Sequence, residues 1–290
     1  MKKTRCAPLL LLLPFSLLMA LVLSACLVVV LQSLGYVPAF GQRELTLSYY
    51  ISALTSSSFL QSLAVSLRIA LLSALLAAAG GVLLCGALVR RHHTRGALLY
   101  LVRLPILVPH AVVAVFVIQL FSQTGLFARL AFALGWIQDY SAFPQLLYTP
   151  GYTGTILAYL WKEIPFVAYF VLAVMSSVDQ ALGQAAENLG ASPLRSFFQI
   201  TLPLSLPAVF NAFLIIFLFA FGGYELPFLL GVTLPKALPV QAYLTFSNPD
   251  LLTRPLAMAM NGVILLLSLL MAVLYTIGTR HLLRRMGGVQ

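Results

Sequence analysis

Charged residues are scarce in this 290-residue sequence: they make up 8% of it, and only 7 residues are acidic. Soluble globular domains carry about 25% charged residues. Apolar residues, in contrast, reach 61%, and the mean hydropathy is +1.00. This composition excludes an ordinary soluble domain. It predicts an all-α integral membrane protein, because an open strand in lipid would leave backbone groups without hydrogen bonds.

Several sequence patterns of enzymes and metal proteins are also missing. The three cysteines, Cys6, Cys26 and Cys85, lie in or beside apolar runs without CxxC spacing, so we expect neither a disulfide framework nor a metal site. There is no GxxxxGK[ST] phosphate loop and no HExxH motif. His92 and His93 are adjacent in a basic loop, which suits neither a zinc site nor a catalytic dyad. We therefore expect no catalytic residue, no metal and no cofactor bound by this chain.

Six apolar runs are long enough to cross a hydrocarbon core of about 30 Å. We predict one transmembrane domain over residues 1–290, with a polar connection at 177–204 and spans at about 8–34, 61–89, 97–122, 153–176, 205–230 and 255–279. The first run follows MKKTR and contains LSAC, which resembles a lipoprotein signal ending at Cys26. The apolar run continues to about residue 36, however, which favours an uncleaved span.

The net charge of +10 follows the connections between spans, which is typical of a topology signal and not of nucleic-acid binding. Two outer connections carry other features. Residues 43–60 are predicted to form an interfacial helix with Tyr49 and Tyr50 at headgroup depth, and residues 123–152 to fold over the outer mouth. Alternate connections carry ten basic residues on one side (Lys2, Lys3, Arg5, Arg90, Arg91, Arg95, Arg195, Arg280, Arg284, Arg285) and four on the other (Arg43, Arg129, Lys236, Arg254). Both termini and the 177–204 connection are therefore predicted to be cytoplasmic.

A short amphipathic stretch, QAAENLGASPLRSFFQITLP at 184–203, lies between the fourth and fifth spans. Its small residues Ala185 and Ala186 allow close approach of a partner, and Gly190 can take a positive φ that ends a helix. Pro193 is placed to begin a second short helix. On residue types alone, a connector without a partner remains an alternative.

The spacing of this stretch resembles the EAA loop of ABC-type importer permeases, which reads Glu-Ala-Ala, three residues, Gly, nine residues, Ile-x-Leu-Pro. Gln184 replaces the usual Glu, which removes a charge and any salt bridge it would make. The resemblance implies a cytoplasmic coupling helix between the fourth and fifth of six spans, seated in a groove of an ATPase subunit. The implied coupling residues are Gln184, Ala185, Ala186, Glu187, Gly190, Ala191, Ser192, Pro193, Ile200, Leu202 and Pro203.

The resemblance extends over nearly the whole chain to the type I importer permeases. LWKEIPF at 160–166, VDQALGQAAENLGAS at 178–192 and FGGYELPFLLG at 221–231 are most similar to the spermidine/putrescine, ferric-iron and thiamine branch. The implied partners are a cytoplasmic ATPase dimer that uses ATP and Mg, a second and different permease chain, an extracytoplasmic substrate-binding protein and membrane lipid. The implied location is the bacterial inner membrane, and the implied solute is a polyamine or a similar small molecule.

Polar residues inside the spans are costly in lipid and are therefore candidates for a solute path. Glu225 follows Gly222, Gly223 and Tyr224, where the fifth helix is expected to loosen; alternatively, Glu225 is solvated beyond the membrane. Lys162 and Glu163 point about 100° apart, so each is expected to find a partner on another helix, either to fix packing or to line a cavity.

Weaker candidates for the path are His110, which follows Pro109, and Asn211. A histidine beside a proline is usually a hydrogen-bonded packing residue, and Asn211 and Asn261 are expected to bond across helices. Arg103 is near enough to a membrane surface to extend toward it.

Two other function classes compete with the importer. An ion-gradient-driven transporter or channel predicts discontinuous helices and an inverted repeat, and the sequence shows no such halves. An intramembrane enzyme needs a partner for His110 that is not evident.

Overall fold

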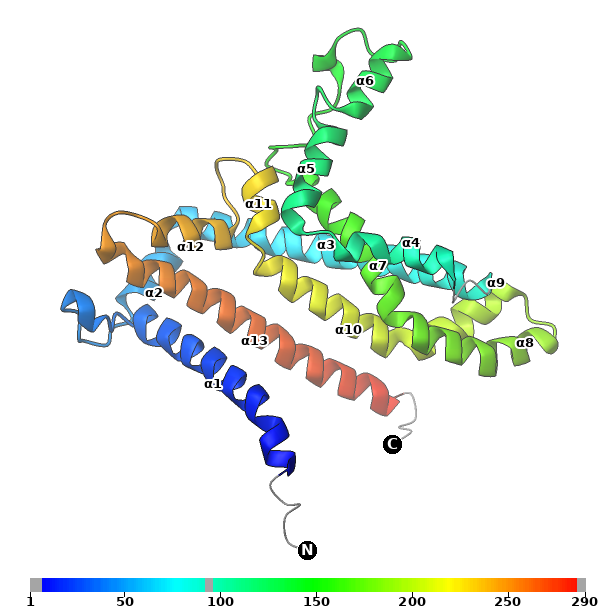
Figure 1. Ribbon diagram of the computed structural model, residues 1–290, viewed down its shortest axis with the longest axis horizontal. Coiled ribbons are helices and arrows are strands. Elements are labelled where there is room, and N and C mark those ends of the chain that lie inside the picture. Colours follow the sequence, from blue (N-terminus) through cyan, green and yellow to red (C-terminus); the bar gives the residue numbers. More distant parts are fainter. Residues whose placement is uncertain (1–6, 92–95, 286–290) are drawn as a thin grey trace, which may run out of the picture. The chain divides into compact units, whose positions relative to one another are not determined.

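The computed structural model describes residues 7–91 and 96–285 and is almost entirely helical over them (Figure 1). An isolated bridge joins Val37 and Gln42. Lys2, Lys3, Arg5, Cys6, His92, His93 and Arg95 lie outside the described residues, and for Arg284 and Arg285 only the backbone is described. The helices are α1 Ala7–Ser33, α2 Ser48–Thr55, α3 Ser57–Arg90, α4 Ala97–Leu107, α5 His110–Phe121, α6 Leu126–Ala133, α7 Thr153–Val178, α8 Gln184–Asn188, α9 Pro193–Ser196, α10 Leu202–Phe221, α11 Glu225–Leu230, α12 Leu238–Phe246 and α13 Arg254–Arg285.

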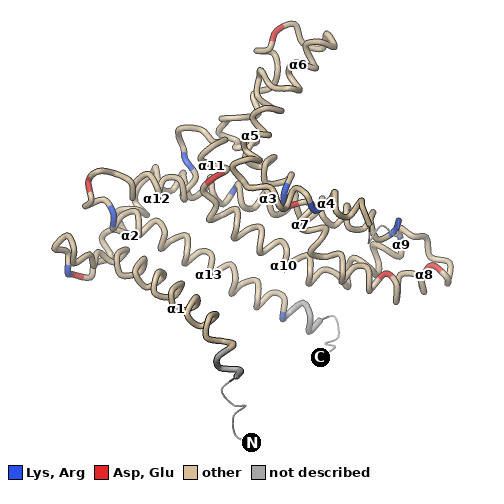
Figure 2. The backbone as a smooth tube through the Cα atoms, viewed as in Figure 1, with Lys and Arg blue, Asp and Glu red and all other residues tan. Residues whose placement is uncertain are grey.

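Six helical stretches are long and apolar enough to cross a membrane, so the predicted helical membrane fold is confirmed. Charged residues lie mainly at helix ends and in connections, and the described part of α1 and all of α10 contain none (Figure 2). The six stretches are 11–33, 57–90, 110–133, 153–188, 193–221 and 251–280.

The third predicted span, 97–122, is wrong as a continuous helix. α4 ends at Leu107, and α5 begins at His110. Val108 adopts extended backbone angles because the ring of Pro109 disfavours a helical conformation in the residue before it. The fifth predicted span, 205–230, is likewise divided: α10 ends at Phe221 and α11 begins at Glu225, which confirms the predicted loosening at Gly222 and Gly223.

The chain forms two compact units. The first consists of residues 7–60, as far as they are described, and 241–266. In it the Tyr50 hydroxyl donates to Ser33 Oγ at 2.8 Å, and the guanidinium of Arg254 lies 5.0 Å from the centre of the Phe246 ring. The predicted interfacial helix is present as α2, but it is shorter than the 43–60 segment, and the Tyr50 hydroxyl is used in a bond within this unit.

The second unit comprises residues 61–240 and 267–285, with the gap at 92–95. α7 is its central helix and packs against α4, α5, α10 and α11. α3 also approaches α7 closely, because Gly80 and Gly81 have no side chains: a Cβ on Gly80 would lie 2.9 Å from Ile164 Cδ1. In the 123–152 connection, α6 packs against α5 and the turn at Tyr140–Ala142.

Candidate functional site

The residues that the sequence singles out gather at two places in the second unit. One is the stretch from α8 to the first residues of α10, residues 184–203, which we call the α8–α9 segment. The other is a group of side chains where α5 and α11 begin, which we call the polar cluster and define as His110, Tyr159, Lys162, Phe219 and Glu225.

The first turn of the α8–α9 segment is built around Gly190. α7 runs through a π-helical turn, Asp179–Gly183, directly into α8. Gly190 then adopts φ +93°, a value that favours glycine. The N–H of Gly190 donates to Glu187 O at 2.9 Å, and that of Ala191 donates to Ala186 O at 3.0 Å. This pair of bonds is the Schellman motif, which satisfies the last carbonyl groups of α8 and reverses the chain.

The second half of the segment begins at Ser192, which caps α9. Its hydroxyl accepts a bond from the N–H of Arg195 at 3.4 Å, and Pro193 occupies the first helical position, as predicted. α9 continues through a second π-helical turn, Phe197–Thr201, into α10.

Side-chain bonds join the two arms of this connection. The hydroxyl of Ser196, which is buried, donates to Gly183 O at 3.0 Å, and that of Thr201 donates to Asp179 Oδ1 at 3.3 Å. The Phe197 ring packs on Gly86 of α3, where an added Cβ would lie 2.7 Å from the ring. The α8–α9 segment is therefore fixed to three helices, α3, α7 and α10.

The outer surface of the segment is apolar and open. Leu189 is 90% exposed and Leu194 is 58% exposed, although both side chains would gain free energy from burial. Ala185 is also exposed, and Ile200, Leu202 and Pro203 lead into α10. Beside this surface is a recess of about 400 Å³, lined by Arg90, Asp179, Gln184, Glu187, Asn188 and Pro193. The arrangement presents two leucines and a polar recess to a partner surface.

The polar cluster forms around the break between α4 and α5. Lys162, on α7, is only 7% exposed, and its Nζ donates to the carbonyl oxygen of Val108 at 2.6 Å. The same atom lies 3.5 Å from His110 Nδ1. A positive charge at the last carbonyl groups of α4 also interacts favourably with that helix's dipole. Lys162 thus stabilises the break that Pro109 causes.

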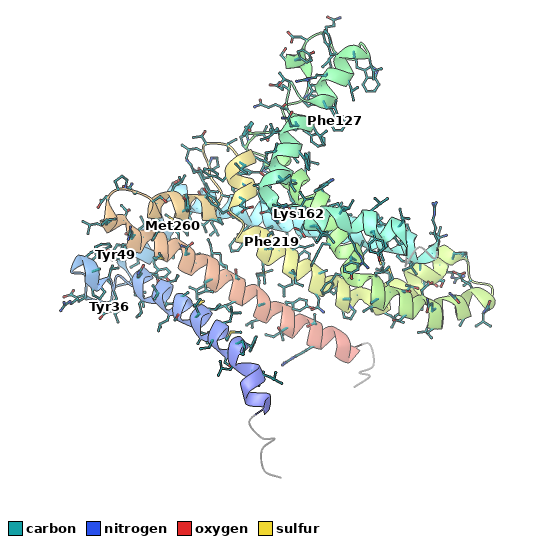
Figure 3. The ribbon with its side chains drawn as sticks, viewed as in Figure 1. Tyr36, Tyr49, Phe127, Lys162, Phe219 and Met260 are labelled. Carbon is teal, nitrogen blue, oxygen red and sulfur yellow. The ribbon has the colours of Figure 1, made fainter. Side chains whose placement is uncertain are left out.

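Aromatic rings from α10 and α7 pack around His110, the neighbour of Lys162. The His110 and Phe219 rings lie 5.0 Å apart between centroids, and the His110 and Tyr159 rings 6.3 Å apart. Figure 3 labels Phe219 on α10 and Lys162 on α7. Tyr159 is fully buried, and its hydroxyl occupies the space beside Gly223 that a side chain there would fill. The break between α10 and α11 therefore packs directly against Tyr159, which lies about one turn before Lys162 on α7.

Glu225 is exposed at the start of α11 and interacts electrostatically with His110, Tyr159 and Lys162. It lies beyond the membrane-length stretch of α10, which ends at Phe221. Tyr224, half-buried, stacks on Phe228 at 5.0 Å. The structure thus brings together His110, Lys162 and Glu225, although His110 and Glu225 are more than 100 positions apart in the sequence.

Two predicted residues stand apart from the cluster. Glu163, 8% exposed, follows Lys162 on α7 but points to a different side of the helix. Asn211 accepts a hydrogen bond from the Tyr275 hydroxyl of α13, so its predicted role across helices is confirmed for that pair. Sequence reasoning missed the Val108 carbonyl as the partner of Lys162. The Val-Pro dipeptide at 108–109 is the signal that could have indicated a free carbonyl there.

Comparisons with known proteins agree on one family. Residues 77–287 match the family described as binding-protein-dependent transport system inner membrane component. A probable ABC transporter permease protein, y4oQ of Sinorhizobium fredii, is 30% identical over 177 residues, which cover 61% of this chain and 56% of that protein. The putrescine transport system permease protein PotI of Escherichia coli is 29% identical over 171 residues, or 58% of this chain and 55% of PotI. The chain thus matches little more than half the length of these two relatives.

Solved structures show the same fold over nearly the full length. The crystal structure of a bacterial ABC transporter involved in the import of the acidic polysaccharide alginate superposes with a TM-score of 0.77. The superposition covers 96% of each chain at 21% sequence identity. Because the family match takes in most of the sequence, the chain belongs to the family of binding-protein-dependent transport system inner membrane components.

Proposed function

We propose that this chain is the membrane-spanning permease subunit of an ATP-driven importer and forms half of its solute path. The α8–α9 segment is the observation that carries the proposal. It presents exposed Leu189 and Leu194 on a turn that is continuous with α7 and α10, that has its two arms bonded to each other, and that is packed on α3. A partner that moves this surface would move three membrane helices with it, which is what coupling to ATP hydrolysis requires.

The energy would come from a cytoplasmic ATPase dimer that binds ATP and Mg. Leu189 and Leu194 would fill an apolar groove on one ATPase subunit, and the small Ala185 would allow its backbone to approach closely. Gln184 replaces the usual Glu beside Arg90 in the recess, so we expect docking there to depend on hydrogen bonds and shape more than on a salt bridge.

The solute path would pass the polar cluster, where two broken helices meet α7. Helix breaks release backbone groups that can bind a solute within a membrane. Glu225, in the polar cluster, suits a small cationic solute such as a polyamine, in line with the name of PotI, a putrescine permease. The alginate transporter is named for an acidic solute, so the fold itself accommodates either sign of charge.

The remaining subunits follow from the same proposal. A substrate-binding protein would deliver solute from outside, and a second, different permease chain would form the other half of the path. The complex would lie in the bacterial inner membrane with both termini of this chain in the cytoplasm. The support for this orientation is the distribution of basic residues between alternate connections.

Isolation of the chain from its native membrane, with identification of what accompanies it, tests the proposal. We expect a P-loop ATPase and a second permease to copurify, and ATP to drive uptake in proteoliposomes. Discontinuous helices are also found in carriers driven by ion gradients. A chain that purifies alone and transports under an ion gradient without ATP would establish that alternative instead.

A further inference from the structure

A second recess, away from both candidate sites, lies in a groove between α4 and α7. Its volume is about 1060 Å³. Leu99 of α4 and Leu172 of α7 are buried and form its base, while the rings of Phe166, Tyr169 and Phe170 line it from α7. None of the described residues lining this groove is acidic. Its volume lies just above the range of about 300–1,000 Å³ that small-molecule sites occupy.

One cation, Arg103, projects into this groove. Its guanidinium carbon lies 4.0 Å from the centre of the Tyr169 ring and 5.7 Å from that of Tyr100. These two rings hold the guanidinium plane in place. The Nε atom of Arg103 is buried and has no hydrogen-bond partner. An arginine fixed in this way has donors available for an anion and loses little side-chain entropy when the anion binds.

The groove changes from polar to apolar along its length. Ser176, Ser177 and Gln180 line the end nearest the α8–α9 segment, and Phe166 and Phe170 line the other end. Arg103 and Tyr169 lie between them in the groove. Because Phe166, Tyr169, Ala173 and Ser176 are spaced three or four residues apart, they share one side of α7, and Gln180 follows in the π-helical turn that continues it. The gradient therefore runs along the helix axis, in the direction in which a membrane changes from headgroup to hydrocarbon.

We propose that this groove binds an anionic phospholipid, with its phosphate on Arg103, its headgroup at Ser176 and Gln180, and an acyl chain along Phe166 and Phe170. Basic pockets between membrane helices near the cytoplasmic surface are known to suit anionic headgroups. The proposal rests on the proposed orientation, in which the α8–α9 end of α7 is cytoplasmic. Charge complementarity selects an anionic lipid, since the groove contributes an arginine and no described carboxylate.

The test measures which lipid stays with the protein. The full chain, purified in detergent with the subunits that accompany it, is mixed with equal amounts of phosphatidylglycerol and phosphatidylcholine, and the retained lipid is quantified by native mass spectrometry. We expect phosphatidylglycerol to be preferred. Arg103→Gln should lower the ratio of the two retained lipids about tenfold, which is the worth of one charge-assisted hydrogen bond. Arg280→Gln removes one exposed positive charge at the same predicted membrane surface and should leave the ratio within about twofold.

A steric pair of variants checks the groove without changing charge. Ala173 lines the groove, and Val174, which is 40% exposed, does not. Ala173→Trp should abolish retention of both lipids, and Val174→Trp should leave it unchanged. If Arg103→Gln fails to fold, Arg103→Lys replaces it and should lower the ratio less, because lysine keeps the charge but loses the planar set of donors.

Three results would overturn the proposal. Arg103→Gln and Arg280→Gln could give the same ratio, inorganic phosphate could displace the lipid at equal concentration, or Arg103→Gln could alter solute uptake with lipid retention unchanged. The second result would indicate a site for free phosphate, and the third a part of the solute path. Lipid retention is measured without ATP or solute, so its failure is distinct from failure of the importer proposal.

Discussion

The ammonium nitrogen of Lys162 lies 2.6 Å from the carbonyl oxygen of Val108, across the break between α4 and α5. Lysine is expensive to bury, and this one is nearly inaccessible to solvent. Its bond satisfies a carbonyl group that the break leaves without an intrahelical partner, because Pro109 ends α4. Lys162 therefore connects the position of α7 to the geometry of the broken third span.

Replacement of Lys162 tests this connection. Lys162→Met should lower the free energy of unfolding by about 1.5–3 kcal/mol, the usual worth of a hydrogen bond to a charged group, and should reduce transport. The melting temperature in detergent and uptake in proteoliposomes measure the two effects. Lys236→Met is the matched control, because Lys236 donates to Thr233 O at 2.7 Å in a solvent-exposed bond and is itself only half-buried. It should change stability by less than about 0.5 kcal/mol. Equal effects at both lysines would contradict the proposed role of Lys162.

The contact between Gly86 and Phe197 should be sensitive to a single methyl group. A Cβ on Gly86 would lie 2.7 Å from the Phe197 ring, so Gly86→Ala should cost about 1–3 kcal/mol and displace the α8–α9 segment. Phe197→Leu, which shortens the side chain, should restore part of the loss in the double variant. Gly278→Ala is the control, since nothing lies within 4 Å of that position and alanine favours the helix. Thermal unfolding measures the stability of both variants. Equal stability of Gly86→Ala and Gly278→Ala would contradict the importance of this contact.

Gly190 should be required for its backbone angle alone. Its φ is +93° and nothing lies within 4 Å of an added Cβ, so a substitution there meets strain but no clash. Gly190→Val should cost about 1–2 kcal/mol locally and uncouple transport from ATP hydrolysis, while Gly190→Asn should be milder. Gly135 has φ +71° with equally open surroundings. Gly135→Val therefore imposes similar strain in the connection after α6 and should leave the ratio of solute transported to ATP hydrolysed unchanged. If the ratio fell in both valine variants, the cause would be backbone strain in general and not the position of Gly190.

The features that could be predicted from the sequence depend on near neighbours. The turn at Gly190, the start of α9 at Pro193 and the loosening at Gly222 each follow from the backbone preferences of one residue. The length of apolar runs likewise predicts the number of spans. The third span was predicted as continuous because hydropathy does not register one proline, although the Val108–Pro109 dipeptide carries that information.

The features that could not be predicted depend on distant residues. Lys162 bonds to a carbonyl group 54 positions earlier in the chain, and Tyr275 to an amide 64 positions earlier. Hydropathy and spacing do not specify which face of one helix meets another, so the sequence could name Lys162 and Asn211 as polar but not their partners. The grouping of His110 with Phe219 and Glu225 has the same origin, since it requires α5, α10 and α11 to meet α7.

One cross-linking experiment decides whether the α8–α9 segment docks on an ATPase. A photoreactive amino acid replaces Leu189, which is 90% exposed, or Leu130 of α6, which is 48% exposed, and native membranes are illuminated. We predict that position 189 yields a cross-link to a protein with a P-loop sequence and that position 130 does not. Absence of any such cross-link from position 189, together with uptake that follows an ion gradient without ATP, would contradict the proposed coupling.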